Sequence, residues 1–210
     1  MYDLPYHKEH DAEVIKQFIL QHPFALLTGC DRNGMPVASQ IPLLMEERGG
    51  RMWLSGHLMK GTDHREAFES NPNVLAVFIG EHSYVSASWY SNQHLPSTWN
   101  YMSVHAKGVI SFLGDAQLID VLRKTSLHFE NNDPQSPTVF DNLPEGFREK
   151  MMELIVAFEI EVTDLDTVFK LSQDRDAESY RNIIERLSLQ DDNGRVISAE
   201  MKKRTGGINQ

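Results

Sequence analysis

An aromatic segment with short polar side chains is the part of this chain best suited to binding. Residues 84–105 hold Trp89 and Trp99, two of the three tryptophans, and Tyr101, among serine, threonine and asparagine side chains. Flat rings beside hydrogen-bonding groups suit either a planar ligand or a subunit interface. The same rings can also anchor core packing, so this segment alone leaves ligand, interface and core open.

A glycine-containing segment is a candidate anion site. Residues 55–61 read Ser-Gly-His-Leu-Met-Lys-Gly and lie between a predicted strand and a predicted helix. Free backbone N–H groups and the positive end of a helix dipole favour phosphate at such a turn. Gly56 and Gly61 would allow close approach, and His57 and Lys60 would supply a hydrogen bond and a charge. The alternative is a plain connecting turn with a solvated lysine.

Two further segments place polar side chains at strands. In the first, Ser39 and Ile41 flank Gln40, whose amide both donates and accepts and so matches the edge of a heterocycle. The second follows the last predicted strand and carries Lys170 and Gln173. A solvent-exposed strand face and a surface strand end would give the same two patterns.

Several familiar signatures are absent from the sequence. It has no Gly-x-Gly-x-x-Gly pattern after a strand, no Walker A loop and no Gly-x-Ser-x-Gly elbow. None of the nine histidines forms a His-x-x-x-His pair, and Cys30 is the single cysteine. We therefore predict no metal site.

Composition limits the class of protein and its partners. The chain has 210 residues, 40% of them hydrophobic and 24% charged, as in an ordinary globular protein. A net charge of −10 argues against direct DNA contact, because such contact depends on phosphate neutralisation by basic residues. We interpret the basic run at 202–204 as a solvated terminus. The lone cysteine and the lack of a signal peptide or a long apolar run predict a cytoplasmic protein that does not contact a membrane.

The elements that must position these groups are mostly strands. Hydrophobic periodicity and turn residues predict strands over 24–28, 35–45, 51–55, 73–78, 82–86, 98–112 and 156–163. Pro36 and Pro42 imply an edge position or a bulge, and Gly108 a bend or bulge. Asn33-Gly34 predicts a tight reversal.

Helices are predicted at the periphery of this sheet. They cover residues 12–21 with Asp11 as cap, 62–70, 118–129, a segment opened by Pro144, and 180–187. The pattern predicts a mostly β (α+β) fold, an antiparallel sheet closing into a small barrel with helices outside. We expect one domain over residues 1–190 and a frayed C-terminal tail over 191–210.

Six short motifs occur along the chain in a fixed order. They are His22-Pro-Phe-Ala25, Ser39-Gln-Ile-Pro-Leu-Leu44, Gly56-His-Leu58, Ser86-Ala-Ser-Trp-Tyr90, Thr98-Trp-Asn-Tyr101 with Val104-His105, and Lys170-Leu-Ser-Gln173. In this order they resemble the PaiB family of FMN-binding negative transcriptional regulators, over about residues 1–190. The resemblance implies a flavin-binding split β-barrel that forms a homodimer with FMN near the subunit interface.

The resemblance also implies roles for residues that match its motifs. The phosphate would be held by Gly56, His57 and Lys60, and the isoalloxazine edge by Ser39, Gln40 and Ile41. The walls of the site would be Trp89, Trp99 and Tyr101, and the residues closing it Lys170 and Gln173.

The chain departs from the family pattern at five positions. Ala87 and Ser97 stand where the family usually has proline, Asp63-His64 where it has Asn-Pro, and Asp174 where it has asparagine. These changes predict a looser aromatic loop and extra negative charge beside the anion site, and hence weaker FMN binding.

The function expected from these features is an FMN-linked regulator or sensor. An alternative on the same scaffold is a flavin-dependent oxidoreductase or flavin reductase using NAD(P)H. The sequence names no proton donor or nucleophile for that chemistry. A third alternative, suggested by the histidines, is a haem-handling protein.

Overall fold

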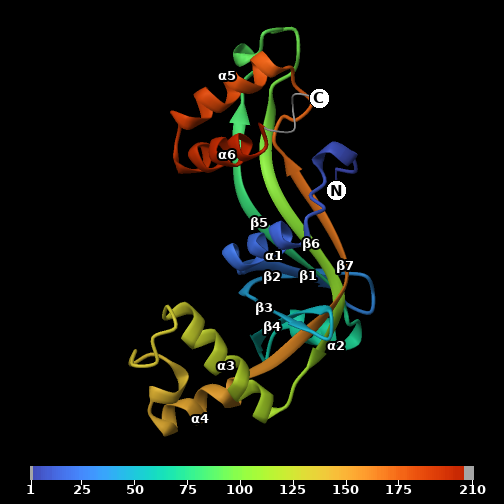
Figure 1. Ribbon diagram of the computed structural model, residues 1–210. Helices are drawn as coiled ribbons and strands as arrows, with labels where there is room; N and C mark the ends of the chain where they lie inside the picture. The colour runs from blue at the N-terminus through green and yellow to red at the C-terminus, as the bar shows by residue number, and fades with distance from the viewer. Residues whose placement is uncertain (1, 206–210) are drawn as a thin grey trace. The chain divides into compact units, whose positions relative to one another are not determined.

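The computed structural model describes residues 2–205, and its main element is a curled antiparallel sheet of seven strands (Figure 1). The strand order is β2-β1-β5-β6-β7-β4-β3. The strands are β1 (Phe24–Cys30), β2 (Pro36–Pro42), β3 (Leu44–Arg48), β4 (Arg51–Met59), β5 (Asn73–Val85), β6 (Thr98–Phe112) and β7 (Ile155–Lys170). The helices within the described range are α1 (Ala12–Gln21), α2 (Asp63–Ser70), α3 (Asp115–Phe129), α4 (Glu145–Leu154), α5 (Ala177–Ser188) and α6 (Asp192–Lys203).

The described chain divides into two compact units. The barrel unit comprises residues 19–78 and 105–165, and the terminal unit comprises residues 2–18, 79–104 and 166–205. Strands β5, β6 and β7 each contribute one part to each unit.

The barrel unit curls because its two edge strands are consecutive in the sequence. Only Leu43 separates β2 from β3, which lie at opposite ends of the strand order. Leu43 is buried, and its N–H donates to the carbonyl of Pro23 at 2.8 Å. The edge position predicted from Pro36 and Pro42 is therefore confirmed for β2, whereas the single strand predicted over 35–45 is wrong. The chain breaks at Pro42 because proline cannot donate to a ladder.

The hairpin between β1 and β2 has the predicted reversal. Gly34 has a φ of +80°, a conformation that glycine adopts without strain. The Asp31 carboxylate accepts hydrogen bonds from the N–H groups of Asn33 at 2.7 Å and Met35 at 2.9 Å. At Gly108 the sequence predicted a bend or bulge. A side chain there would collide with the Glu161 carbonyl of β7, so glycine allows β6 and β7 to lie close together.

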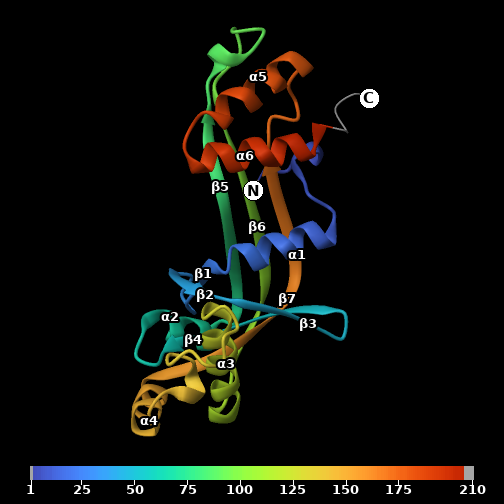
Figure 2. The same ribbon diagram turned by 60° about the vertical axis from the view of Figure 1, so that its left-hand side comes forward.

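The terminal unit contains the ends of three strands with α5 and α6 packed beside them (Figure 2). The N–H of Ser179 donates to the cap Asp176 at the start of α5, and that of Gly194 donates to Asp191 before α6, both at 2.9 Å. Ile197 and Met201 of α6 are fully buried. The predicted fraying from residue 191 is thus wrong as far as the structure describes the tail. Residues 206–210 lie outside the described part.

Other boundaries differ from prediction in an informative way. The strands expected over 73–78 and 82–86 are one strand, β5, because Gly80 stays extended and buried within it. The strand expected over 51–55 continues to Met59. The predicted helices α1, α2, α3 and α5 are confirmed, as is the helix opened by Pro144.

Candidate functional site

Gly56 and His57 lie inside strand β4, so the turn predicted for them is wrong. Gly56 is paired with Phe158 of β7, and His57 with Ala157. A Cβ on Gly56 would come within 2.9 Å of the Phe158 ring and 3.1 Å of the Pro42 carbonyl oxygen. Glycine is needed here for close packing in the barrel core rather than for the approach of a phosphate.

The turn itself consists of Lys60 and Gly61, just before α2. The Lys60 N–H donates to the carbonyl of Leu154 at 2.8 Å, and its Nζ lies 3.3 Å from the carbonyl oxygen of Met152. Lys60 therefore stabilises the C-terminal end of α4, where exposed carbonyls favour a cation.

The first turn of α2 keeps one buried side-chain donor that the described residues do not use. Thr62, the N-cap residue, makes no side-chain cap, because its hydroxyl donates instead to the Met59 carbonyl at 2.8 Å. Arg65 has a buried Nε with no partner within residues 2–205. The Asp63 carboxylate accepts the N–H of His64 at 2.8 Å and adds a negative charge beside this donor.

Ser39 is brought to the same place from the sheet edge. Its hydroxyl lies 3.3 Å from His64 Nδ1, and the hydroxyl of Thr62 lies 3.1 Å from His64 Nε2. We call Ser39, Thr62, His64 and Arg65 the edge site. Gln40 and Ile41 follow Ser39 along β2, which has a hydrogen-bonded neighbour on one side only. Alternate backbone N–H and C=O groups of such a strand point outward and are open to a ligand.

Lys170 and Gln173 lie at the end of β7 in the terminal unit. The Lys170 ammonium donates to Thr98 Oγ1 and lies 5.2 Å from the centre of the Tyr2 ring. Gln173 Oε1 lies 3.1 Å from His7 Nδ1. Burial lowers the pKa of Lys170, opposed by the Asp174 charge, and burial raises the pKa of Tyr101.

The turn that carries these residues is strained. Ser172 has a φ of +61°, an uncommon conformation for a side-chain-bearing residue, and costs about 1 kcal/mol or more. The surroundings hold it there: its buried hydroxyl donates to Asn100 Oδ1 at 2.9 Å, and its carbonyl accepts the N–H of Arg175 at 3.1 Å. Backbone strain of this kind is typical of functional sites.

Two residues near this turn were not predicted as site residues. The Tyr90 side chain is 3% exposed, and its hydroxyl has no hydrogen-bond partner within the described chain. The Arg175 guanidinium carbon lies 4.8 Å from the centre of the Tyr90 ring. Tyr90 directly follows the predicted Trp89, and Arg175 lies two residues after the predicted Gln173; this proximity is the sequence signal that points to them.

The aromatic segment separates into an exposed part and a packed part. Trp99 is 52% exposed, and its ring centre lies 5.8 Å from that of Tyr84 and 5.9 Å from that of His82. Trp89 is half-buried in a short 3₁₀ turn, and its carbonyl accepts a hydrogen bond from Asn182.

The two positions where the family usually has proline hydrogen-bond each other. The Ala87 N–H donates to Ser97 Oγ at 3.0 Å. A proline at position 87 would have no N–H to donate. The loop therefore has a hydrogen bond between positions 87 and 97 that two prolines could not form.

The described residues contain neither a cluster of candidate metal ligands nor a membrane-spanning helix. Within residues 2–205, no three histidine, cysteine or acidic side chains gather closely enough to hold a metal ion. No helix in that range is long and apolar enough to span a bilayer.

Comparison with known proteins identifies the family. The family model described as "Putative FMN-binding domain" matches residues 1–164. The chain belongs to this FMN-binding family. It is 33% identical to "Protease synthase and sporulation protein PAI 2" of Bacillus subtilis (strain 168), over 96% of each chain. The predicted PaiB-type family and its FMN cofactor are thereby confirmed.

Solved structures agree on the fold. The FAD and heme binding protein from Mycobacterium smegmatis aligns with a TM-score of 0.55 at 17% identity, covering 78% of this chain and 73% of that one. The flavocytochrome Anf3 from Azotobacter vinelandii aligns with a TM-score of 0.56 at 17% identity, covering 86% and 78%. The predicted split-barrel fold is confirmed.

Proposed function

We propose that this protein is a dimeric FMN-linked regulator or sensor that holds its cofactor along strand β2 and the start of α2. The observation that carries this proposal is the edge site, where Ser39, His64 and Thr62 form a chain of polar contacts beside an open strand edge. When bound, FMN supplies reversible electron transfer.

The residues of β2 fit the edge of the isoalloxazine ring. That edge alternates hydrogen-bond donors and acceptors, as do the outward backbone N–H and C=O groups of every second residue in this part of β2. The Gln40 side chain is exposed and can both donate and accept. These three residues remain the proposed ring contacts.

We move the proposed phosphate contacts from Gly56 and His57 to the first turn of α2. The unpartnered Arg65 Nε and the His64 ring are the proposed phosphate contacts at the positive end of this helix. Lys60 adds positive charge from the adjoining turn. Asp63 acts against an anion, and we therefore expect weaker binding than an asparagine at this position would give.

We propose that the aromatic residues of the terminal unit contact the flavin from the partner subunit, at a subunit interface. The exposed rings of Trp99, Tyr84 and His82 form the kind of aromatic surface that is enriched in interfaces. Trp89, Tyr101, Lys170 and Gln173 are the remaining proposed contacts from this unit.

Regulation without direct DNA contact is the role we favour. The relative named for protease synthesis and sporulation motivates a regulatory role. A net charge of −10, however, disfavours binding to the phosphate backbone of DNA. In the basic run at 202–204, Lys203 pairs with Glu200, and Arg204 pairs with Glu200 and Glu9. These ion pairs leave little unpaired positive charge for contact with DNA phosphates.

The deciding experiment is an absorption spectrum of the purified protein followed by titration with FMN and with riboflavin. We expect a flavin spectrum and tighter binding of FMN than of riboflavin. Arg65→Gln should lower the affinity for FMN by about tenfold or more, as for the loss of one hydrogen bond to a charged group. The affinity for riboflavin, which has no phosphate, should stay nearly unchanged. Arg51→Gln, which removes an exposed arginine paired with Glu161, is the matched control.

Three outcomes would contradict parts of this proposal. A colourless protein that ignores micromolar FMN would overturn the cofactor site. Equal losses of affinity for FMN and riboflavin in Arg65→Gln would show that α2 does not bind the phosphate. A monomer mass by light scattering would exclude the dimer, whereas rapid NADH or NADPH oxidation by the FMN-loaded protein would favour the oxidoreductase alternative.

A further inference from the structure

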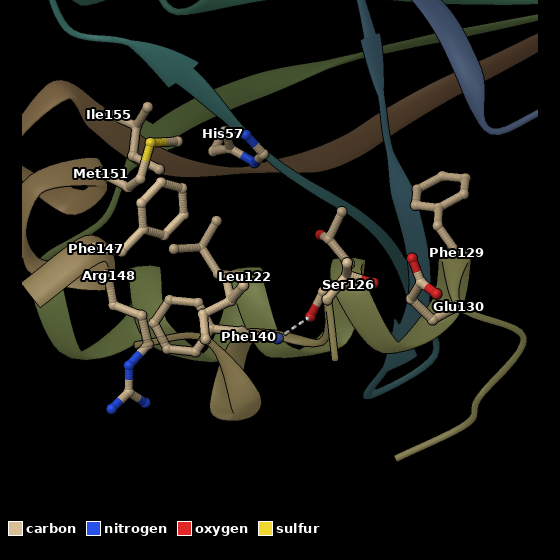
Figure 3. A pocket seen from close by; sticks show the side chains of 13 residues that line it. His57, Leu122, Ser126, Phe129, Glu130, Phe140, Phe147, Arg148, Met151 and Ile155 are labelled. Atoms are coloured by element: carbon tan, nitrogen blue, oxygen red, sulfur yellow. Dashed lines mark hydrogen bonds between the residues drawn. The ribbon is translucent and has the colours of Figure 1, made fainter. Parts of the chain in front are cut away.

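A cavity of about 270 Å³ lies in the barrel unit between α3, α4 and one side of β4. Figure 3 shows its apolar walls, to which α3 contributes Leu122 and α4 contributes Phe147 and Met151. Phe140, from the segment between these helices, closes another side. Phe147 is 50% exposed and Met151 is 41% exposed, so the cavity opens to solvent through apolar side chains.

Most polar groups in the cavity wall already have partners. The Ser126 hydroxyl donates to the Arg123 carbonyl at 3.2 Å and accepts the N–H of Phe140 at 2.9 Å. The Glu130 carboxylate accepts the Ser136 hydroxyl at 2.8 Å. The Arg148 guanidinium lies over the Phe140 ring and is directed away from His57 in Figure 3.

His57 differs from these groups. Its side chain lies on the face of β4 opposite to Leu54, Gly56 and Leu58, which point into the barrel core. No group within residues 2–205 hydrogen-bonds its ring. Burial lowers the pKa of His57, so the ring is neutral at pH 7 and offers one donor and one acceptor.

We propose that this cavity is a second ligand site, which binds a small neutral aromatic molecule and holds it by one hydrogen bond to His57. The size follows from the volume: a cavity of roughly 150 Å³ binds benzene, so 270 Å³ suits a bicyclic ring system. We expect a neutral ligand, because burying a charge without a partner is costly. Of the charged lining residues in the described chain, Arg148 points away from His57 and Glu130 is hydrogen-bonded to Ser136.

This site is separate from the one proposed for FMN. Its lining residues come from β4, α3, α4, the segment between those two helices and the first residue of β7, Ile155. None of them belongs to β2 or α2, which form the edge site. A molecule in the cavity would contact β4 from the outer face of the barrel.

The test is titration of the full chain with 1-naphthol and with indole, followed by ligand-observed NMR or calorimetry. We expect saturable binding of both probes at a single site, and weaker binding of the charged analogue 2-naphthoate. Met151→Trp should fill the cavity and lower the affinity for 1-naphthol by more than tenfold. Met35→Trp, which alters an exposed methionine at the β1–β2 hairpin, is the matched control and should change nothing.

A second variant tests the hydrogen bond. His57→Phe keeps an aromatic ring at this position and should weaken the binding of 1-naphthol about two- to twelvefold, as for the loss of one neutral hydrogen bond. Binding of naphthalene, which has no hydrogen-bonding group, should not weaken. Unsaturable binding, tighter binding of 2-naphthoate, insensitivity to Met151→Trp or equal losses of naphthalene and 1-naphthol would each overturn the proposal. Displacement of 1-naphthol by FMN would also overturn it, since the cavity would then be part of the flavin site.

Discussion

The edge site and the α3–α4 cavity each contain one histidine, seven residues apart in the sequence, and their surroundings are opposite. Both ring nitrogens of His64 lie near hydroxyls, Ser39 at 3.3 Å and Thr62 at 3.1 Å. The ring of His57 faces aromatic and aliphatic side chains and has no hydrogen-bond partner in the described chain. The polar surroundings suit an anionic, hydrogen-bonding cofactor and the apolar ones a neutral ring.

Two glycines five residues apart show the same contrast in packing. Gly56 is buried between Phe158 and Pro42, whereas no atom of residues 2–205 lies within 4 Å of a Cβ built on Gly61. Both were predicted to admit a phosphate. The structure assigns one to the core and leaves the other in an open turn.

The largest expected effect comes from substituting these glycines. Gly56→Ala should lower the free energy of unfolding by about 3 kcal/mol, because its Cβ would overpack the core against a backbone carbonyl. Gly61→Ala should be neutral or stabilise by about 0.5 kcal/mol, since its φ is not positive and the space is open. Urea denaturation measures both values. Equal costs would show that the two positions are not packed differently.

A crossed pair of histidine variants should separate the two sites. His64→Ala should lower the affinity for FMN by about tenfold, through loss of one hydrogen bond to a charged group. The affinity for 1-naphthol should not change. His57→Phe should leave FMN unchanged. The measurements are the same two titrations. A loss of FMN affinity in His57→Phe would return this residue to the phosphate site.

The smallest expected effect is on the pH dependence of stability. Burial lowers the pKa of His57 below 6.5, so between that lowered pKa and 6.5 the unfolded chain binds more protons than the folded one. The free energy of unfolding should therefore fall as pH drops below about 6.5, by at most about 1.4 kcal/mol per pH unit for each such histidine. The charged groups lining the same cavity are Glu130 and Arg148. Glu130 stays ionised there, because hydroxyl hydrogen bonds lower its pKa.

The measurement is urea denaturation of the wild type and His57→Phe at about pH 7.5 and 5.5. The variant should show a smaller loss of stability than the wild type. Burial also lowers the pKa of His7, so His7→Gln should remove part of the remaining dependence. Identical losses in all three proteins would assign the effect to other groups.

Local features of the sequence predicted much of the secondary structure. Asp11, whose carboxylate accepts the N–H groups of Glu13 and Val14, predicted the start of α1, and Asn33-Gly34 predicted the hairpin. These signals are read correctly because a cap or a tight turn depends on neighbours within four residues. The C-terminal helix was missed because its stability comes from tertiary burial of Ile197 and Met201, beyond what its own polar sequence indicates.

The sequence by itself determined the family, the FMN cofactor, the mostly β fold and the residues of β2 that we still propose for the flavin ring. Only the tertiary structure decided which chemistry the residues around position 57 can perform. Strand pairing of β4 with β7 removed Gly56 from any turn and placed His57 against α3 and α4. The physical reason is that partners such as Phe158 and Met151 lie about a hundred residues away in the sequence, and the pattern of a local motif carries no information about contacts at that distance.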